Sequence, residues 1–467
     1  MNIDRKLTAA ELTPSLNRLF DIASTKAKSL DRDWDVCKGA PVFTVEGKYT
    51  ARGWTEWTQG FQFGWAILAF DATDDRSLLD IGRKRTIDSM AAHVTHTGVH
   101  DHGFNNLSTY GNLRRLMREM RIEQNDWELR FYEMAIKASG AVQAARWSGT
   151  PAPPPSKKTA NSTSLGYIYS FNGPHSLFVD TMRTCRILGV AHQLGHVLMH
   201  ENDRSANLLK RCVLHGLATS QYIVFHGDSS HTYDVRGRTA HEAIFNRNDG
   251  NFRCRSSQQG YSAFSTWTRG LAWAMLGYAE ELEFFRSIPD AEFSTAVGLS
   301  RSDVMAAFES AARATCDHYI NDCAASDGIV YWDDGAPNLW RMGDWRARPA
   351  DPFNEHEPVD SSASVIAAQG LLRLGRVLGD ERYARAGLTV AKRLLEEPYI
   401  STKPQHEGLL LHSVYHRPNG WDHIPAGRKV PCGESSLWGD YHLMELAVMI
   451  QRMADSTKPY LTFFDQP

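Results

Sequence analysis

Two aspartates stand out because each lies among apolar or aromatic neighbours. Asp101 lies in VHDHGF, residues 99–104, and Asp180 lies in LFVDTM, residues 177–182. Removal of water around a carboxyl group disfavours its charged form and raises its pKa. Such a carboxyl can donate a proton near neutral pH and take one back later in the same reaction. On the pattern alone, a helix cap for Asp180 and a turn residue for Asp101 are the simpler interpretations.

A second group of residues begins with Gln259 in the tripeptide QGY and continues through STWTRG, residues 265–270, to Trp273. If a helix begins near residue 265, Arg269 and Trp273 lie four residues apart on one face. The planar guanidinium of Arg269 could bind a carboxylate or a polar sugar edge, and Trp273 could pack on a sugar ring. The alternative is structural, with the arginine paired to a neighbour and the tryptophan in the core.

Histidines offer a rival chemistry. His192, His196 and His200 are spaced by four residues, and four more histidines lie between residues 93 and 102. Histidines four residues apart on a helix can bind zinc. The glutamate of the HExxH motif is missing, however, and the third histidine would lie two turns from the first. We therefore expect solvated or buried histidines and no metal site, and no nucleotide-binding glycine motif is visible either.

Bulk properties exclude several classes of partner. A net charge of −3 gives no general attraction to nucleic acid or to acidic membranes, so an anionic ligand must meet local cations. The first residues lack the apolar core of a secretory signal, and no run of about 18 apolar residues could span a membrane. The seven cysteines are scattered and never form CxxC. We therefore expect free thiols and a cytoplasmic location.

Helical periodicity dominates the elements that must position these groups. An apolar stripe over residues 304–319 follows a capping box formed by Ser300 and Asp303, and a second stripe covers residues 383–394. An aspartate recurs where helices are expected to begin, at Asp75, Asp126, Asp203 and Asp380. This recurrence suggests repeated helical hairpins, as in a toroid.

Long connections between the helices carry many of the unusual residues. Residues 147–165, 333–359 and 400–436 are rich in proline, glycine, aromatic and charged residues. Long loops in a compact domain are usually functional. None of them resembles a flexible linker, so the sequence predicts one domain over residues 1–467.

Several segments occur in an order that resembles the unsaturated glucuronyl hydrolases, glycoside hydrolase family 88. The resemblance covers residues 54 to about 450. The matching segments are WTQGF (57–61), HDHGF (100–104), FVDTM (178–182), SSHTYD (229–234), QGYSAFSTWTRGLAWAMLGY (259–278), VYWDDGAP (330–337), DSSASVIAAQGLL (360–372) and ESSLWGDYHLMEL (434–446). The segment STWTRGLAW is nearer to this family than to the unsaturated galacturonyl hydrolases.

The resemblance implies an all-α fold, an (α/α)6 barrel whose long loops form one active-site face. It implies a substrate that is an oligosaccharide released by a polysaccharide lyase, with a 4,5-unsaturated uronic acid at its non-reducing end. Asp180 would protonate C4 of the double bond and then activate water for attack at C5, which differs from ordinary displacement at C1. Asp101 would bind ring hydroxyls and influence Asp180. The matching substrate-binding positions are Trp57, His231, Gln259, Arg269 and Trp273. No metal, organic cofactor, nucleic acid or membrane is implied.

The chain departs from the family pattern at three places. Ser257 and Gln258 precede Gln259 where the family often has histidine, and Arg183-Thr184 stands where it usually has an asparagine-containing stretch. The loop over residues 333–359 is unusually long. It is either surface decoration or a rim that contacts sulfates or the next sugar.

Other functions stay open on the sequence. A sugar epimerase on the same type of barrel would use a histidine pair drawn from His192, His196 and His231, and an unsaturated galacturonyl hydrolase is also compatible. A non-catalytic toroid that binds sugars or proteins is a third alternative. The sequence does not name the parent polysaccharide or the oligomeric state.

Overall fold

The computed structural model describes residues 1–52, 56–151 and 164–464, so Trp54, where the resemblance begins, lies outside the described residues. Its central feature is a ring of six inner helical segments, each in contact with the next and the last in contact with the first. They are α2 (Gln59–Thr73), α5 and α6 (His102–Asn106 and Asn112–Arg118, joined by a π-helical turn, Leu107–Gly111), α8 and α9 (Thr181–Thr184 and Arg186–Gln193), α11 (Thr268–Arg286), α14 (Ser361–Leu378) and α16 (Leu437–Ala454).

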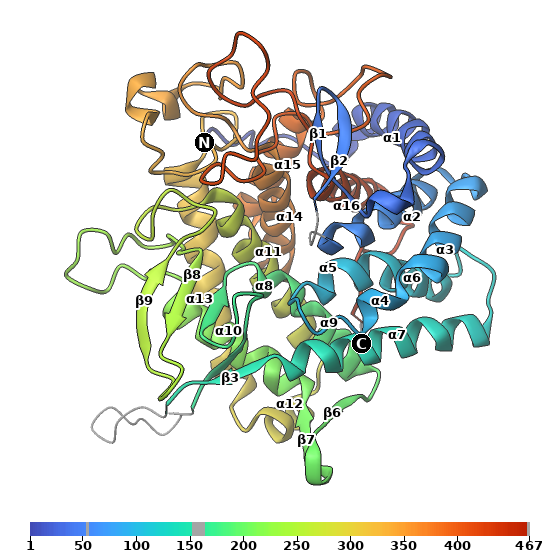
Figure 1. Cartoon of the computed structure of the whole chain (residues 1–467), viewed down its shortest axis with the longest axis vertical. Helices are drawn as coiled ribbons and strands as arrows, with labels where there is room; N and C mark the ends of the chain where they lie inside the picture. Colours follow the sequence, from blue (N-terminus) through green and yellow to red (C-terminus); the bar gives the residue numbers. More distant parts are fainter. Residues whose placement is uncertain (53–55, 152–163, 465–467) are drawn as a thin grey trace.

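Six outer helices alternate with the inner segments along the chain. They are α1 (Thr13–Asp33), α3 (Arg76–Ser89), α7 (Asp126–Ala145), α10 (Leu208–Tyr222), α13 (Arg301–His318) and α15 (Glu381–Leu394). Figure 1 shows α1, α3 and α7 at the outside of the molecule and α11 and α14 nearer its middle. Within the described residues the chain therefore forms a closed (α/α)6 barrel, which confirms the predicted all-α fold class.

Inner and outer helices differ in how much of their surface is buried. Nearly every residue of α11 and α14 is buried, because these helices are covered on all sides. By contrast, α15 buries one stripe that includes Tyr383, Val390 and Leu394 and exposes the opposite face to solvent. The stripe predicted over residues 304–319 likewise becomes the buried face of α13.

Helix caps follow the sequence in most of the predicted places. The side chains of Asp75, Ser300 and Asp380 each accept a hydrogen bond from a backbone N–H in the first turn of α3, α13 and α15. The prediction for Asp203 is wrong, because α10 begins five residues later and is capped by Asn207. The prediction for Asp126 is off by one residue, since Asn125 caps α7.

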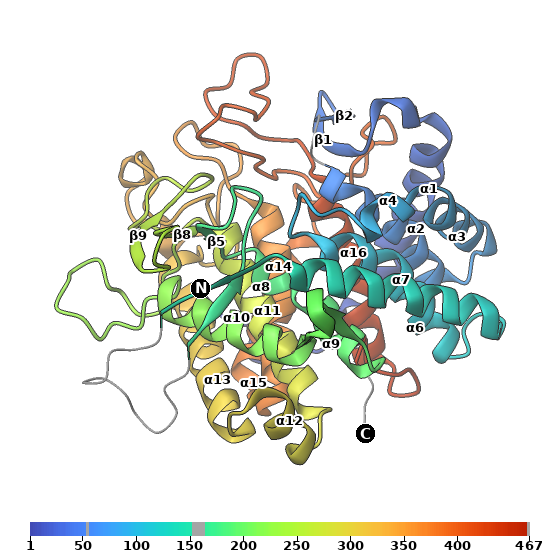
Figure 2. The ribbon, with the colours of Figure 1, turned by 60° about the horizontal axis from the view of Figure 1, so that its bottom comes forward.

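Short strands connect the helices and lie in small sheets. Two pairs are β1 (Pro41–Val45) with β2 (Lys48–Ala51) and β3 (Trp147–Gly149) with β4 (Gly166–Ile168), and a third is β6 (Val197–Met199) with β7 (Ser205–Asn207). A three-stranded antiparallel sheet has the order β5 (Ser176–Phe178), β8 (Glu242–Phe245), β9 (Phe252–Ser256), and Figure 2 shows these strands side by side. Two short α-helices, α4 (Ala91–Val94) and α12 (Asp290–Val297), lie in other connections.

The histidines spaced by four do not share a helix. Helix α9 ends at Gln193, and the chain turns at Gly195, whose φ of +72° suits glycine, into β6. His192 lies 3.0 Å from the carboxylate of Glu292, so the helical zinc arrangement considered for these histidines is not formed. Separately, none of the helices in the described residues has both the length and the apolar character that crossing a membrane requires.

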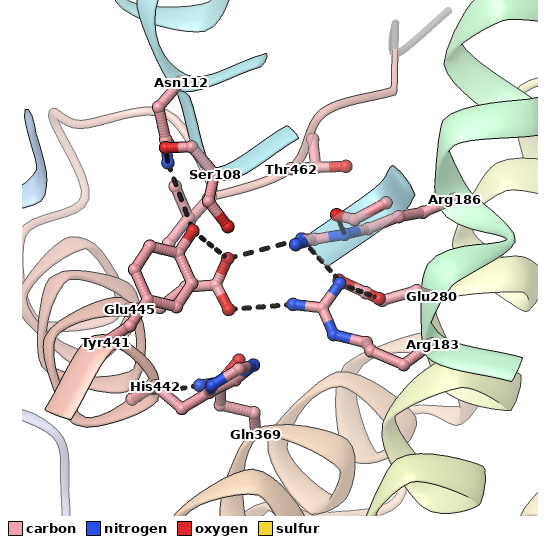
Figure 3. A network of polar contacts seen from close by, with 12 residues as sticks. Ser108, Asn112, Arg183, Arg186, Glu280, Gln369, Tyr441, His442, Glu445 and Thr462 are labelled. Atoms are coloured by element: carbon pink, nitrogen blue, oxygen red, sulfur yellow. Dashed lines mark hydrogen bonds and ion pairs between the residues drawn. The ribbon is translucent and has the colours of Figure 1, made fainter. Parts of the chain in front are cut away.

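Charged side chains fill part of the barrel interior (Figure 3). The guanidinium of Arg183 donates to Glu280 and, at 2.8 Å, to Glu445, while Arg186 lies 3.4 Å from Glu445. Burial raises the pKa of Glu445, but Arg183 and Arg186 lower it more, so that it stays ionised far below neutral pH. Arg183, one of the departures from the family pattern, thus belongs to a buried and compensated ion network.

Candidate active site

A pocket opens where the inner helices begin. Its walls come from the segments that precede or open α2, α5, α8 and α11 and from the loop that precedes α16. The residues that line it are Trp57, His100, Asp101, Phe104, Phe171, Asp180, Gln258, Gln259, Trp267, Arg269, Trp273, Tyr415, His416, Asn419 and Trp421. Of the seven site residues predicted from the sequence, the pocket brings together six.

Asp180 occupies the position before α8 without serving as its cap. Its side chain accepts no capping hydrogen bond, and its half-buried carboxyl includes an oxygen, Oδ1, that is inaccessible and has no partner among the described residues. The preceding residue, Val179, donates its backbone N–H to the carbonyl of His241 at 3.0 Å, which continues the pairing of β5 with β8. The helix-cap interpretation of Asp180 therefore fails.

Both pocket aspartates titrate near neutral pH. Burial raises the pKa of Asp180 to about 7, with opposition from Arg269 and a further increase from the charge of Asp101. Burial also raises the pKa of Asp101 to about 7, opposed by Arg146. Burial keeps the pKa of the adjacent His100 well below its usual value. His100 is therefore neutral, and its 3.8 Å contact with Asp101 is no ion pair at neutral pH.

Arg269 is held by the protein rather than left open for a ligand. Its guanidinium donates to Asp360 at 2.9 Å, to Gln259 Oε1 at 3.0 Å, and to the backbone carbonyls of Val414 and Tyr415. The structural alternative considered for this residue is thus realised, although Arg269 also lines the pocket. Since Gln259 Oε1 accepts from Arg269, the amide nitrogen of Gln259 is the group that can donate to a ligand.

The aromatic residues divide into floor and walls. Trp273 is 2% exposed and packs against Phe104, with ring centroids 4.7 Å apart, so it belongs to the floor. Trp57 is half-buried and stacks on Trp438 at 5.2 Å. Trp421 is also half-buried and lies 5.2 Å from the ring of Tyr415. Trp57 and Trp421 therefore offer aromatic surface to a ring in the pocket.

The structure does not bring His231 to the pocket. This residue is exposed and stacks on Tyr233, with centroids 5.0 Å apart and planes within 8°. A different histidine, His241, lies directly behind the pocket wall, where its ring contacts Trp267 at 4.9 Å. Its Nδ1 accepts the backbone N–H of Gln258 at 3.0 Å, and burial lowers its pKa to about 3. A neutral ring that accepts at Nδ1 carries its proton on Nε2. Through this hydrogen bond to Gln258, His241 holds in place the backbone next to Gln259.

The pocket also contains four loop residues that were not predicted from the sequence, Tyr415, His416, Asn419 and Trp421. They belong to the connection over residues 400–436, whose length and composition were the only signal for them. The loop over residues 333–359 contributes no lining residue among those described. Its Arg346 donates instead to the backbone carbonyl of Asp322 at 2.6 Å.

Comparisons with known proteins agree with this architecture. No family model matches the chain. The unsaturated glucuronyl hydrolase of Bacillus sp. (strain GL1) is 23% identical over 418 residues, which cover 87% of this chain and 89% of that protein. The unsaturated chondroitin disaccharide hydrolase of Streptococcus agalactiae serotype III (strain NEM316) is 22% identical, with 87% and 84% covered. Among solved structures, an unsaturated glucuronyl hydrolase specific for heparin superposes with a TM-score of 0.68 at 17% identity, covering 96% of this chain and 99% of that one.

These matches span the barrel from end to end rather than one motif. They confirm the resemblance to unsaturated glucuronyl hydrolases that the ordered segments predicted, and they confirm the barrel fold. The similar proteins are glycoside hydrolases, and a pocket with two protonatable carboxyls is consistent with an enzyme of that kind.

Proposed function

We propose that this protein is an unsaturated glucuronyl hydrolase, which removes a 4,5-unsaturated uronic acid from the non-reducing end of oligosaccharides made by polysaccharide lyases. The observation that carries the proposal is the carboxyl of Asp180, which makes no capping hydrogen bond to α8. Its pKa is raised to about 7 in a pocket that also holds Asp101. The names of the similar proteins, which act on glucuronyl and chondroitin disaccharide substrates, support it.

In the proposed reaction the protonated carboxyl of Asp180 donates its proton to C4 of the C4=C5 double bond. Positive charge develops at C5 and is shared with the ring oxygen. The carboxylate of Asp180 then takes a proton from water as the water oxygen bonds to C5, which regenerates the acid. The resulting C5 hemiketal opens to a ketone, the former ring oxygen becomes a hydroxyl on C1, and C1 collapses to an aldehyde as the remaining sugar leaves.

The other pocket residues receive roles that fit their contacts. Asp101 binds ring hydroxyls, and its charge helps to keep Asp180 protonated. Gln259 donates from its amide nitrogen, while Trp57 packs on the unsaturated ring. Trp273 forms the floor beneath it. Arg269 acts as a positioning residue, because its guanidinium is occupied by Asp360, Gln259 and two backbone carbonyls.

The position of the pocket suits an anionic sugar. It lies at the N-terminal ends of inner helices, where the helix dipoles favour negative charge. The substrate carboxylate is conjugated to the double bond and would face this end of the barrel. The net charge of −3 gives no general attraction for such a ligand, so this local field and the nearby Arg269 would have to supply it.

Two wider features belong to the same proposal. We take residues 1–467 as one catalytic domain, since the inner helices that carry the pocket come from all parts of the chain. The seven cysteines are unpaired in the structure, which suits a reducing compartment such as the cytoplasm.

The decisive experiment follows the ultraviolet absorbance of the conjugated double bond during incubation with lyase-generated disaccharides, sulfated and unsulfated. The intact protein should remove the absorbance and release the second sugar. Asp180→Asn should slow this loss by roughly 10²–10⁴-fold, the usual effect of removing a general acid and base. Asp228→Asn, at an exposed aspartate outside the pocket, is the matched control. An unchanged rate in Asp180→Asn would refute the mechanism, and an epimeric product without cleavage would favour the epimerase.

A further inference from the structure

A second cluster of reactive side chains lies where α13 ends, and none of its members lines the pocket. His318 is the last residue of α13, Cys323 ends the π-helical turn that follows (Tyr319–Cys323), and Asp334 lies in the next loop. Their ligand atoms all lie within 4.8 Å of one another. His318 Nε2 is 3.2 Å from Asp334 Oδ2, and Cys323 Sγ is 4.0 Å from the same oxygen.

We propose that this His318–Cys323–Asp334 site binds a divalent transition metal ion, with zinc as the best fit. A nitrogen, a thiolate and a carboxylate are all ligands that zinc accepts, at about 2.0–2.3 Å in a tetrahedral arrangement. In that arrangement neighbouring ligand atoms lie roughly 3–4 Å apart. The separations of 3.2 and 4.0 Å match this without rearrangement of the backbone. Three protein ligands leave the fourth position for water.

A neighbouring carboxylate orients the ring of His318, as is usual for histidines that bind metals. Asp322 faces the other ring nitrogen of His318, with Oδ2 3.2 Å from Nδ1. A carboxylate on one nitrogen directs the other nitrogen to the metal and makes it a better donor. The backbone N–H of Thr266 donates to Asp334 Oδ1 at 2.7 Å and leaves Oδ2 to face the other two ligands.

The side chains of the cluster are buried, unlike those of a chance group of polar residues at the surface. His318 is 2% exposed, Cys323 is 1% exposed, and the side chain of Asp334 is 3% exposed. Without a metal, His318 can form an ion pair with Asp322 and Asp334, and that pair accounts for three of the groups. Cys323 contacts the same pair only weakly through Asp334, at 4.0 Å, and also interacts with the ring of His318. A metal ion would bind the three ligand atoms directly, since they already face one another.

One neighbouring cation opposes the metal, and this provides a sharp test. Arg238 Nε lies 3.6 Å from Asp334 Oδ2, and the guanidinium also donates to the carbonyl of Phe264 at 3.0 Å. A metal ion must share Asp334 with this positive charge. Removal of the Arg238 charge should therefore tighten metal binding rather than weaken it.

The site would connect the outer helix to a wall of the pocket. Asp333, the neighbour of Asp334, accepts the backbone N–H of Tyr261 at 2.7 Å, and Asp334 holds Thr266. These two contacts fix both ends of the segment that runs from Gln259 to Trp267. The metal would therefore stabilise that segment. Its binding is independent of the proposed reaction.

The spacing of these three ligands in the sequence matches no common metal-binding motif. Four residues separate His318 from Cys323 and ten separate Cys323 from Asp334, which fits none of the usual zinc motifs. The sequence led us to expect only free thiols. For Cys323 we propose instead a role as a metal ligand.

The test uses the full-length chain with Cys37→Ser and Cys254→Ser, which removes the two exposed thiols. Titration of the metal-free protein with Co²⁺ should give one equivalent of binding and a thiolate-to-cobalt charge-transfer band, and Zn²⁺ should displace the cobalt. Cys323→Ser should abolish the band, whereas Cys316→Ser, at another buried thiol of the same region, should leave it unchanged.

Two further variants separate a metal site from a fold that has simply been damaged. Asp322→Asn should weaken zinc binding about 10–100-fold, as loss of an orienting carboxylate usually does. Arg238→Gln should strengthen it by about tenfold, since a like charge close to the site is lost. Absence of the band in the parent protein, its survival in Cys323→Ser, or weaker binding in Arg238→Gln would overturn the proposal. None of these readouts requires turnover, so this result and the test of the hydrolase function stand apart.

Discussion

The carboxyl of Asp180 should make the stability of the fold depend on pH in a direction opposite to that of an aspartate held in an ion pair. Its pKa is about 7 in the folded protein and 3.8 when it is solvated. Ionisation is therefore disfavoured in the folded state. The cost to the free energy of unfolding is absent below about pH 4, grows as the pH rises toward 7, and is constant above it. Asparagine does not ionise, so Asp180→Asn removes this cost.

The size of the effect follows from the pKa difference. One pKa unit corresponds to about 1.4 kcal/mol, and a window from pH 5 to pH 8 covers about two units of the shift. This gives about 2–3 kcal/mol as an upper value. Because Asp180 is half-buried and faces an open pocket, we discount this by about half for solvent screening. The variant should gain about 1–1.5 kcal/mol relative to the parent between the two pH values.

The assay is urea unfolding followed by tryptophan fluorescence at pH 5 and pH 8. The free energy of unfolding of Asp180→Asn should exceed that of the parent by more at pH 8 than at pH 5. The exposed control Asp228→Asn should show no such change between the two values. If the advantage of Asp180→Asn is the same at both pH values, the carboxyl is not held protonated by burial, and the physical basis of the proposed acid is lost.

Three further predictions concern the pocket. The kcat/KM for unsaturated disaccharides should fall as the pH rises through about 7, because Asp180 must be protonated, and Asp101→Asn should move this fall to lower pH, since loss of the Asp101 charge lowers the pKa of Asp180. Gln259→Ala should lower kcat/KM roughly tenfold, as expected for one lost hydrogen bond, without lowering the melting temperature by more than a few degrees. Arg269→Lys should destabilise the protein by about 3–5 kcal/mol in thermal or urea unfolding, because it disrupts a buried pair with Asp360 and removes planar donors that lysine does not replace.

Much of the fold could be predicted because its determinants are local. The stripes of α13 and α15 and the caps Ser300 and Asp380 depend on residues within a few positions of one another. Asp203 was misassigned because the same residue type suits another local structure. It and Asn202 adopt positive φ values of 56° and 59° at the turn between β6 and β7, a conformation that asparagine and aspartate tolerate.

The site was predicted where it lies within contiguous segments and missed where it depends on distant pairing. Asp101, Asp180 and Gln259 each stand in a short recognisable segment. The choice between His231 and His241 depends instead on the pairing of β8 with β5, which no local pattern reveals. Likewise, the guanidinium of Arg269 is bound by Asp360, which lies 91 residues away in the chain.

Burial raises the pKa of Asp180 although arginines belong to the same barrel. Arg183 follows Asp180 by three residues in the chain, and a guanidinium in contact with the carboxyl would favour its ionised form. Arg183 is instead bound by Glu280 and Glu445 inside the barrel (Figure 3). Arg269, the cation that does act on Asp180, is paired with Asp360. Burial is the largest influence on the pKa of Asp180 and outweighs the opposing charge of Arg269. A protonated acid can thus persist in an arginine-rich barrel.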